Sequence, residues 1–148
     1  MLSRVARAAF AAASLPPQIP YQATLVLTDD AEMRTLNRTW RGKDASTNVL
    51  SFPAGEPRGE TPGEPCPLGD VVLAAETVLT EADAQGVEAA DHVAHLVVHG
   101  MLHLLGFDHE READTLRMEA LETKVLAGLG IADPYAEDAR ADPAEVSP

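Results

Sequence analysis

Residues 93–109 read VAHLVVHGMLHLLGFDH, and this stretch determines both the expected core helix and the expected chemistry. Its apolar residues recur at helical spacing from about residue 88 to Leu105. Gly106 ends the helical pattern, because glycine adopts the positive φ that a helix end often requires. The pattern predicts a long, mostly apolar helix that carries all five histidines of the chain on itself or on the turn after it.

His99 and His103 are four residues apart, so their side chains lie on one helical face with Cβ atoms about 5–6 Å apart. Two imidazoles at this spacing can share one zinc ion. The turn at Gly106 can bring His109 towards the same point. The spacing therefore predicts three imidazole ligands and an open fourth coordination position, which is typical of catalytic zinc sites. The alternative is a cluster of buried, hydrogen-bonded histidines without a metal.

His95 also lies four residues from His99, but His95, His99 and His103 span about 12 Å of helix axis at 1.5 Å per residue. One ion cannot bind all three, so we expect His95 in the core or behind the ligands. The same histidine spacing occurs in metzincin proteases, where a glutamate after the first histidine acts as general base. Gly100 stands at that position here, which weakens a peptidase interpretation.

The rest of the chain alternates between strand and helix patterns. We expect strands over residues 21–27, 49–52 and 68–74, and helices over residues 5–15, 30–41, 76–85, 88–105 and 111–129, with a loop over 54–67. This order predicts one α+β domain over residues 1–131, with a small mixed β-sheet covered by helices and the metal site on the long helix and the following turn. Residues 132–148 hold five acids and three prolines and predict a disordered tail.

Side-chain oxygens and apolar spacing add local predictions. Thr28 or Asp29 is expected to cap the second helix. The inward residues of that helix are predicted to be Met33, Leu36 and Trp40, and those of the last helix include Leu116, Ala120, Val125 and Leu129.

Composition limits the class of protein. The chain of 148 residues carries 24 acidic and 11 basic residues, a formal charge of −13, which argues against broad coating of nucleic acid. A hydrophobic content of 45% excludes a wholly disordered chain, and the single cysteine, Cys66, excludes a disulfide framework. The sequence has no run long enough to span a membrane, and the first residues only loosely imitate a secretory signal, so we expect a cytoplasmic protein.

Three blocks of the sequence resemble the YbeY endoribonucleases, also called rRNA maturation factors. They are LNRTWRGKDASTNVLSFP (residues 36–53), LGDVVL (68–73) and HGMLHLLGFDH (99–109), in the order of that family. The resemblance implies an α+β fold, one zinc ion per chain bound by His99, His103 and His109, and hydrolysis of single-stranded RNA in 16S rRNA 3'-end maturation and ribosome biogenesis. It also implies small-subunit ribosomal proteins and an assembly GTPase as partners.

The resemblance also aligns Arg41 with the family's functionally important arginine, and Arg41 and His99 are the predicted catalytic residues. A guanidinium can hold a phosphate by two charge-assisted hydrogen bonds. Arg34, Arg38 and Arg41 share a helical face and are predicted to contact RNA, the alternative being a solvated polar face.

Asn48 and Ser51 are further candidate substrate contacts. Two positions depart from the family pattern: Asn48 stands where many relatives have Asp, and Phe107 replaces the more usual Tyr. Trp40 is predicted to anchor the core, the alternative being a stack on an RNA base. Two other functions remain open: a non-catalytic, zinc-containing ribosome-assembly factor, and a metallopeptidase.

Overall fold

The computed structural model describes residues 2–12, 20–54, 66–107 and 112–134. The helices of this part are α1 (Leu2–Ala12), α2 (Asp30–Arg41), α3 (Ala75–Gln85), α4 (Ala89–Leu104) and α5 (Glu112–Gly128). Its strands are β1 (Tyr21–Thr28), β2 (Val49–Pro53) and β3 (Cys66–Ala74). The last residues of the first expected helix, 13–15, and most of the expected tail lie outside the described residues. Within the described ranges, no helix is long and apolar enough to cross a membrane.

The three strands form one mixed sheet in the order β1-β3-β2, with β3 parallel to β1 and antiparallel to β2. Strand β3 begins at Cys66, two residues earlier than predicted, because Cys66 pairs with Tyr21 and its N–H donates to the carbonyl of Pro20. The β1–β3 register shifts between Gln22 and Ala23. Such an irregularity is where a strand tolerates a proline such as Pro67.

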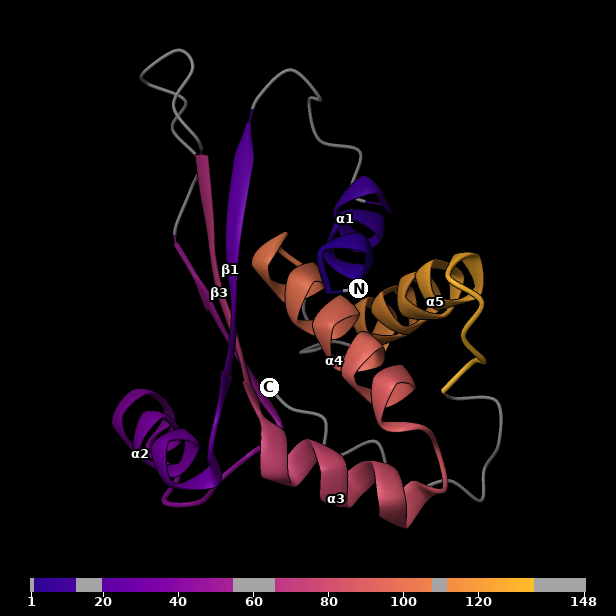
Figure 1. Cartoon of the computed structure of the whole chain (residues 1–148). Helices are drawn as coiled ribbons and strands as arrows, with labels where there is room; N and C mark the ends of the chain where they lie inside the picture. The colour runs from indigo at the N-terminus through magenta and orange to yellow at the C-terminus, as the bar shows by residue number, and fades with distance from the viewer. Residues whose placement is uncertain (1, 13–19, 55–65, 108–111, 135–148) are drawn as a thin grey trace.

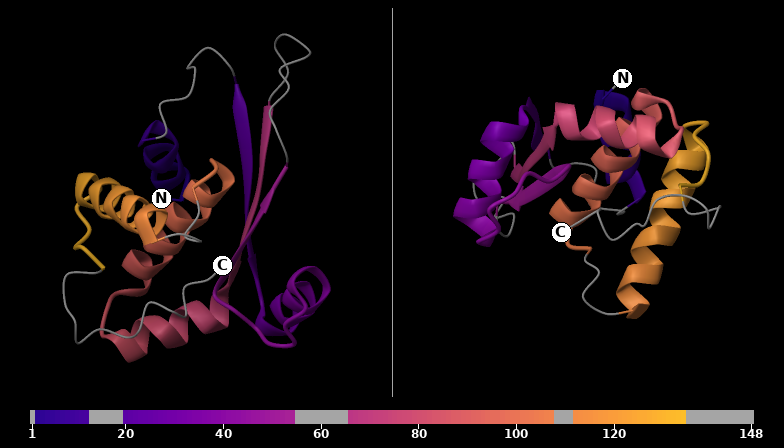
Figure 2. Two further views of the ribbon diagram at one scale, coloured as in Figure 1. Left: turned by 180° about the vertical axis from the view of Figure 1, so that it is seen from behind. Right: turned by 90° about the horizontal axis from the view of Figure 1, so that it is seen from below.

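Helices cover both faces of this sheet (Figure 1). Alternate residues of β2 and β3 face opposite sides: Val49, Val71 and Leu73 belong to the larger core with α1, α4 and α5, whereas Leu50 and Val72 belong to a smaller core with α2. Both views in Figure 2 show α2 separated from α4 by the strands. The predicted α+β domain with a small mixed sheet covered by helices is confirmed.

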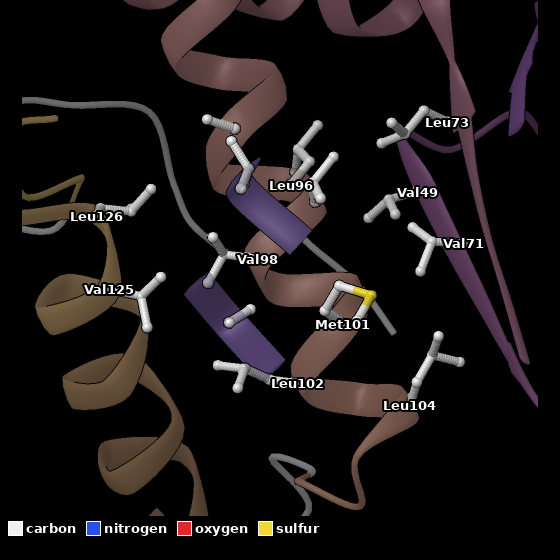
Figure 3. Packing of buried hydrophobic residues seen from close by; sticks show 14 of the residues in the cluster. Val49, Val71, Leu73, Leu96, Val98, Met101, Leu102, Leu104, Val125 and Leu126 are labelled. Carbon is white, nitrogen blue, oxygen red and sulfur yellow. The ribbon is translucent and has the colours of Figure 1, made fainter. Parts of the chain in front are cut away.

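Helix α4 is the centre of the larger core. Figure 3 shows it between the strands that carry Val49 and Val71 and helix α5, which contributes Val125 and Leu126. Leu96 and Leu102 of this helix are completely buried. The long apolar helix predicted from the sequence is therefore the element on which α1, α3, α5 and one face of the sheet pack.

Gly100 sets the distance between α4 and the sheet. A Cβ atom at this position would lie 2.6 Å from Cγ1 of Val71 and 3.2 Å from Oγ of Ser51, which is closer than side chains pack. The Ser51 hydroxyl donates a hydrogen bond of 3.1 Å to the Gly100 carbonyl. The residue after His99 is thus a contact between helix and sheet.

Helix α2 has the cap that the sequence predicts. Oδ1 of Asp29 accepts a hydrogen bond of 2.8 Å from the backbone N–H of Glu32. The helix ends at Gly42, whose φ of 72° lies in the left-handed region.

We expect Asp29→Ala to lower the free energy of unfolding by about 1 kcal/mol, because one N–H of the first turn loses its acceptor. Urea denaturation measures this change. Asp29→Asn is the control, since asparagine caps helices about as well as aspartate. Equal loss in both variants would contradict a capping role.

The inward face of α2 differs from the prediction. Met33 and Asn37 are its buried residues, and Leu36 is half-buried. Trp40 was expected in the core, but its side chain is 68% exposed. Asn37 takes an inward place because its Nδ2 donates a 2.8 Å hydrogen bond to the Ala45 carbonyl. This bond stabilises the turn after the helix.

The inward face of α5 also differs. Leu116 is 62% exposed and Ala120 is exposed, so both predictions are wrong, whereas Val125 is buried as expected. The buried face includes Met118 and Glu122. The carboxylate of Glu122 therefore occupies an inward position of α5 that apolar spacing did not predict.

Candidate functional site

The histidines of α4 form a row along one face of the helix. His92, His95 and His99 are buried, and His103 is half-buried. Their spacings of three and four residues keep them on one side of the helix. Two carboxylates meet this row, Glu81 from α3 and Glu122 from α5.

His99 and His103 direct nitrogens at each other, as predicted. Their Nε2 atoms are 3.1 Å apart, and the ring centroids are 4.6 Å apart at an interplanar angle of 77°. Two nitrogens bound to one zinc ion at roughly 2.0–2.1 Å, at a tetrahedral angle, would be about 3.3 Å apart. The separation of the two Nε2 atoms therefore fits two ligands of one ion.

Glu122 lies behind this pair. Its side chain is completely buried, and its Oε1 lies 3.0 Å from Nδ1 of His99 and 3.5 Å from Nε2 of His95. Burial by itself raises the pKa of this carboxyl group, but hydrogen bonds and charge from His95 and His99 outweigh that effect and lower the pKa to about 2. Glu122 is therefore ionised at neutral pH and can only accept hydrogen bonds.

The ionised Glu122 determines the tautomer of His99. Because the carboxylate accepts, Nδ1 of His99 is the donor, and a neutral imidazole then carries its lone pair on Nε2. Metal-binding histidines commonly have their second nitrogen held by a carboxylate in this way. The arrangement directs the lone pair of His99 towards His103.

The structure describes two of the three predicted zinc ligands, His99 and His103. The third ligand, His109, lies outside the described residues. Among the residues that the structure describes, no group of three His, Cys, Asp or Glu side chains is arranged to hold a metal ion. His95 is buried against Glu122, in agreement with its expected place in the core.

Asn48 belongs to a second polar cluster at the other end of the histidine row. Its side chain is almost completely buried, and its Nδ2 donates a 3.0 Å hydrogen bond to Oε1 of Glu81. The same oxygen lies 2.9 Å from Nε2 of His92. Oδ1 of Asn48 has no hydrogen-bond partner among the described residues. This cluster joins the start of β2 to α3 and α4.

The arginine row lies on α2, which packs on the opposite face of the sheet from α4. Arg34 makes two hydrogen bonds with Asp44, of 2.8 and 3.0 Å, and Arg38 lies 3.6 Å from the same carboxylate. The hydrogen bond with Arg34 lowers the pKa of Asp44. Arg41 is half-buried, and its Nη1 donates to Oδ1 of Asn37 at 3.5 Å.

Ser51, a predicted substrate contact, donates a hydrogen bond to the carbonyl of Gly100, the residue after His99. The structure thus brings His99, His103 and Ser51 to one side of the sheet. It does not place Arg34 or Arg38 beside them.

Glu122 is the residue of this site that sequence reasoning missed. One signal was available, because Glu122 is spaced four residues after Met118 and three before Val125 on the buried face of α5. An acid on an apolar face requires a buried partner. The histidine row of α4 supplies that partner only after the two helices pack.

Fold and site together define a small α+β protein with a carboxylate-held histidine pair on its central helix. The family model described as Endoribonuclease YbeY matches residues 1–130. The chain is 56% identical over 135 residues to the Endoribonuclease YbeY of Azorhizobium caulinodans, covering 89% of this chain and 83% of the relative. It is 57% identical over 125 residues to that of Rhodospirillum rubrum, covering 83% of this chain and 62% of the relative. The chain belongs to the YbeY endoribonuclease family.

A solved structure supports the fold. The solution structure of TM1509 from Thermotoga maritima matches with a TM-score of 0.51 and 19% sequence identity, covering 91% of this chain and 88% of that one. At this identity the likeness concerns the fold alone.

Proposed function

We propose that this protein is a zinc-dependent endoribonuclease, specific for single strands, that acts in the cytoplasm in 16S rRNA 3'-end maturation and ribosome biogenesis. The observation that carries the proposal is the 3.1 Å approach of the His99 and His103 Nε2 atoms, with His99 held by a buried carboxylate, in a chain of an endoribonuclease family. Small-subunit ribosomal proteins and an assembly GTPase are the proposed partners.

His99, His103 and His109 are the proposed zinc ligands, one ion per chain. When bound, zinc supplies a Lewis acid that polarises a phosphoryl oxygen and lowers the pKa of water towards about 7. Glu122 keeps the proton of His99 on Nδ1, so that Nε2 keeps its lone pair. The buried position of Glu122 also excludes water from the back of the imidazole, which fixes the ring orientation.

Arg41 is proposed to hold a phosphate of the RNA. A guanidinium is a planar group that matches the geometry of a phosphate, and Nη1 of Arg41 donates a hydrogen bond to Asn37. Asn37 is itself buried and bonded to the Ala45 carbonyl, so it orients Arg41 from a rigid position. Arg34 and Arg38 are proposed to contact the RNA backbone more weakly, because both are engaged by Asp44. Asn48 and Ser51 complete the proposed substrate contacts.

A peptidase mechanism fits this structure poorly. The position after His99 would have to carry the general base, but a Cβ atom there meets Val71 and Ser51 of the sheet. A carboxylate at residue 100 would have to displace the strands. The packing of α4 against the sheet therefore disfavours a peptidase that uses a glutamate at residue 100 as its general base.

The proposed activity is tested with a labelled single-stranded RNA carrying the 3' end of 16S rRNA, incubated with the zinc-loaded protein. We expect the single strand to be cut and a matched duplex to remain intact. His103→Ala should lower the cleavage rate by about 100-fold or more, because the Lewis acid is lost. Arg41→Glu should also lower it strongly, whereas Arg4→Glu, a charge reversal at an exposed residue of α1, should not.

Full activity in both His103→Ala and Arg41→Glu would show that cleavage occurs elsewhere. If the protein binds zinc but cuts no RNA under any condition, the non-catalytic assembly factor is the better description. Zinc content is measured in the same preparations by elemental analysis.

A further inference from the structure

Trp40 is an exposed aromatic residue on the last turn of α2. Its side chain is 68% exposed, and its ring meets Phe52 edge-on at a centroid distance of 6.1 Å and an angle of 70°. An indole offers a large apolar surface that proteins usually bury. The contact with Phe52 supports the ring while leaving most of it open to solvent.

Trp40 and Gly100, the residue after His99, contact neighbouring residues of strand β2 on its two faces. Phe52 contacts Trp40 on the α2 side, and its neighbour Ser51 donates to the carbonyl of Gly100 on the α4 side. Gly100 directly follows His99. In the described part of the chain, β2 pairs with β3 and is an edge strand of the sheet. A flexible chain passing over this edge would reach both sides.

The surroundings of Trp40 favour a polyanion. Arg38, Arg41 and Lys43 lie within three residues of it, and Asp44 is the acid that follows them. Asp44 is already bound by Arg34 through two hydrogen bonds. In a chain of formal charge −13, this stretch is locally basic and complements phosphate groups.

We propose that Trp40 stacks on an unpaired base of the RNA substrate, at the point where the RNA crosses the edge of the sheet formed by β2. The inference rests on the proposed function and adds a substrate contact to it. Stacking requires a base with a free face, so it selects single strands without selecting a sequence. A protein partner fits less well, because the local excess of cations around Trp40, in a chain of formal charge −13, complements a polyphosphate backbone.

Fluorescence tests the proposal directly, because Trp40 is the single tryptophan of the chain. The His103→Ala protein is titrated with single-stranded RNA, so that binding is measured without cleavage. We expect the tryptophan emission to be quenched by the single strand and to change little with a duplex. Trp40→Ala, followed with labelled RNA, should weaken binding by about 5- to 150-fold, and Trp40→Phe by less.

Leu116→Ala is the matched control, because Leu116 is 62% exposed on α5 and its loss should leave RNA binding unchanged. In the zinc-loaded enzyme, Trp40→Ala should raise KM with little change in kcat. RNA binding that neither quenches Trp40 nor weakens in Trp40→Ala would overturn the proposal while leaving the proposed function intact. The proposal would also be overturned if Trp40→Ala weakened binding of a ribosomal protein and left RNA binding unchanged. If the protein neither binds nor cuts RNA, both fail.

Discussion

Glu122→Ala is expected to lower the free energy of unfolding by about 3–5 kcal/mol. The carboxylate is completely buried between His95 and His99, so its removal leaves two buried imidazoles without this acceptor. It also leaves an empty volume beside α4, which adds to the cost. Urea denaturation of the metal-free protein measures the change, with a constant m-value as the sign of two-state unfolding.

The variant Glu122→Gln separates charge from packing. Glutamine keeps the volume and an oxygen that can accept from His99, so we expect the fold to remain. Zinc affinity should fall about 10- to 100-fold, because the orienting carboxylate is lost. Competition with a chromophoric chelator measures it. Asp83→Asn removes a carboxylate from the exposed surface of α3 and should change neither quantity. Unchanged zinc affinity in Glu122→Gln would contradict a positioning role for Glu122.

Gly100→Ala is expected to destabilise the protein by about 2–3 kcal/mol. The added Cβ would lie 2.6 Å from Cγ1 of Val71, so α4 would have to move away from the sheet. His99 adjoins this position, and zinc affinity should fall along with stability. Thermal and urea unfolding measure the first effect, and chelator competition measures the second.

Two controls make this prediction specific. Gly128→Ala adds the same methyl group to α5 at a place with no neighbouring atom within 4 Å, so it should be neutral or slightly stabilising. Val71→Ala removes the methyl groups that a Cβ at residue 100 would meet. The double variant should therefore lose at least about 1 kcal/mol less than the sum of the single variants. Strict additivity would show that Val71 is not the obstacle.

Local patterns in the sequence were enough to predict the elements of this fold. Strand alternation and helical spacing located the strands and helices of the described residues to within a few positions. The cap at Asp29 was also predictable, because capping depends on residues three positions apart. Helices, strands and caps depend on residues a few positions apart in the chain, so they can be predicted from the sequence alone.

The inward faces of α2 and α5 were harder to predict, for one physical reason. Each buries a polar residue, Asn37 in α2 and Glu122 in α5, and apolar periodicity does not count such a residue as inward. The inward face predicted for each helix was therefore rotated about the helix axis relative to the buried face, and Trp40 and Leu116 were wrongly expected to be buried. Burial of Asn37 and Glu122 is favourable only because Ala45 and the histidines offer hydrogen bonds.

The sequence by itself determined the helix that carries His99 and His103 and the spacing that places both on one face, because helical geometry acts over four residues. Tertiary structure alone decided that Glu122 holds His99, that Gly100 lies against Val71, and that the arginine row lies across the sheet from the histidine pair. These contacts join residues from different elements. They depend on how the helices pack against a three-stranded sheet, and no local pattern specifies that packing.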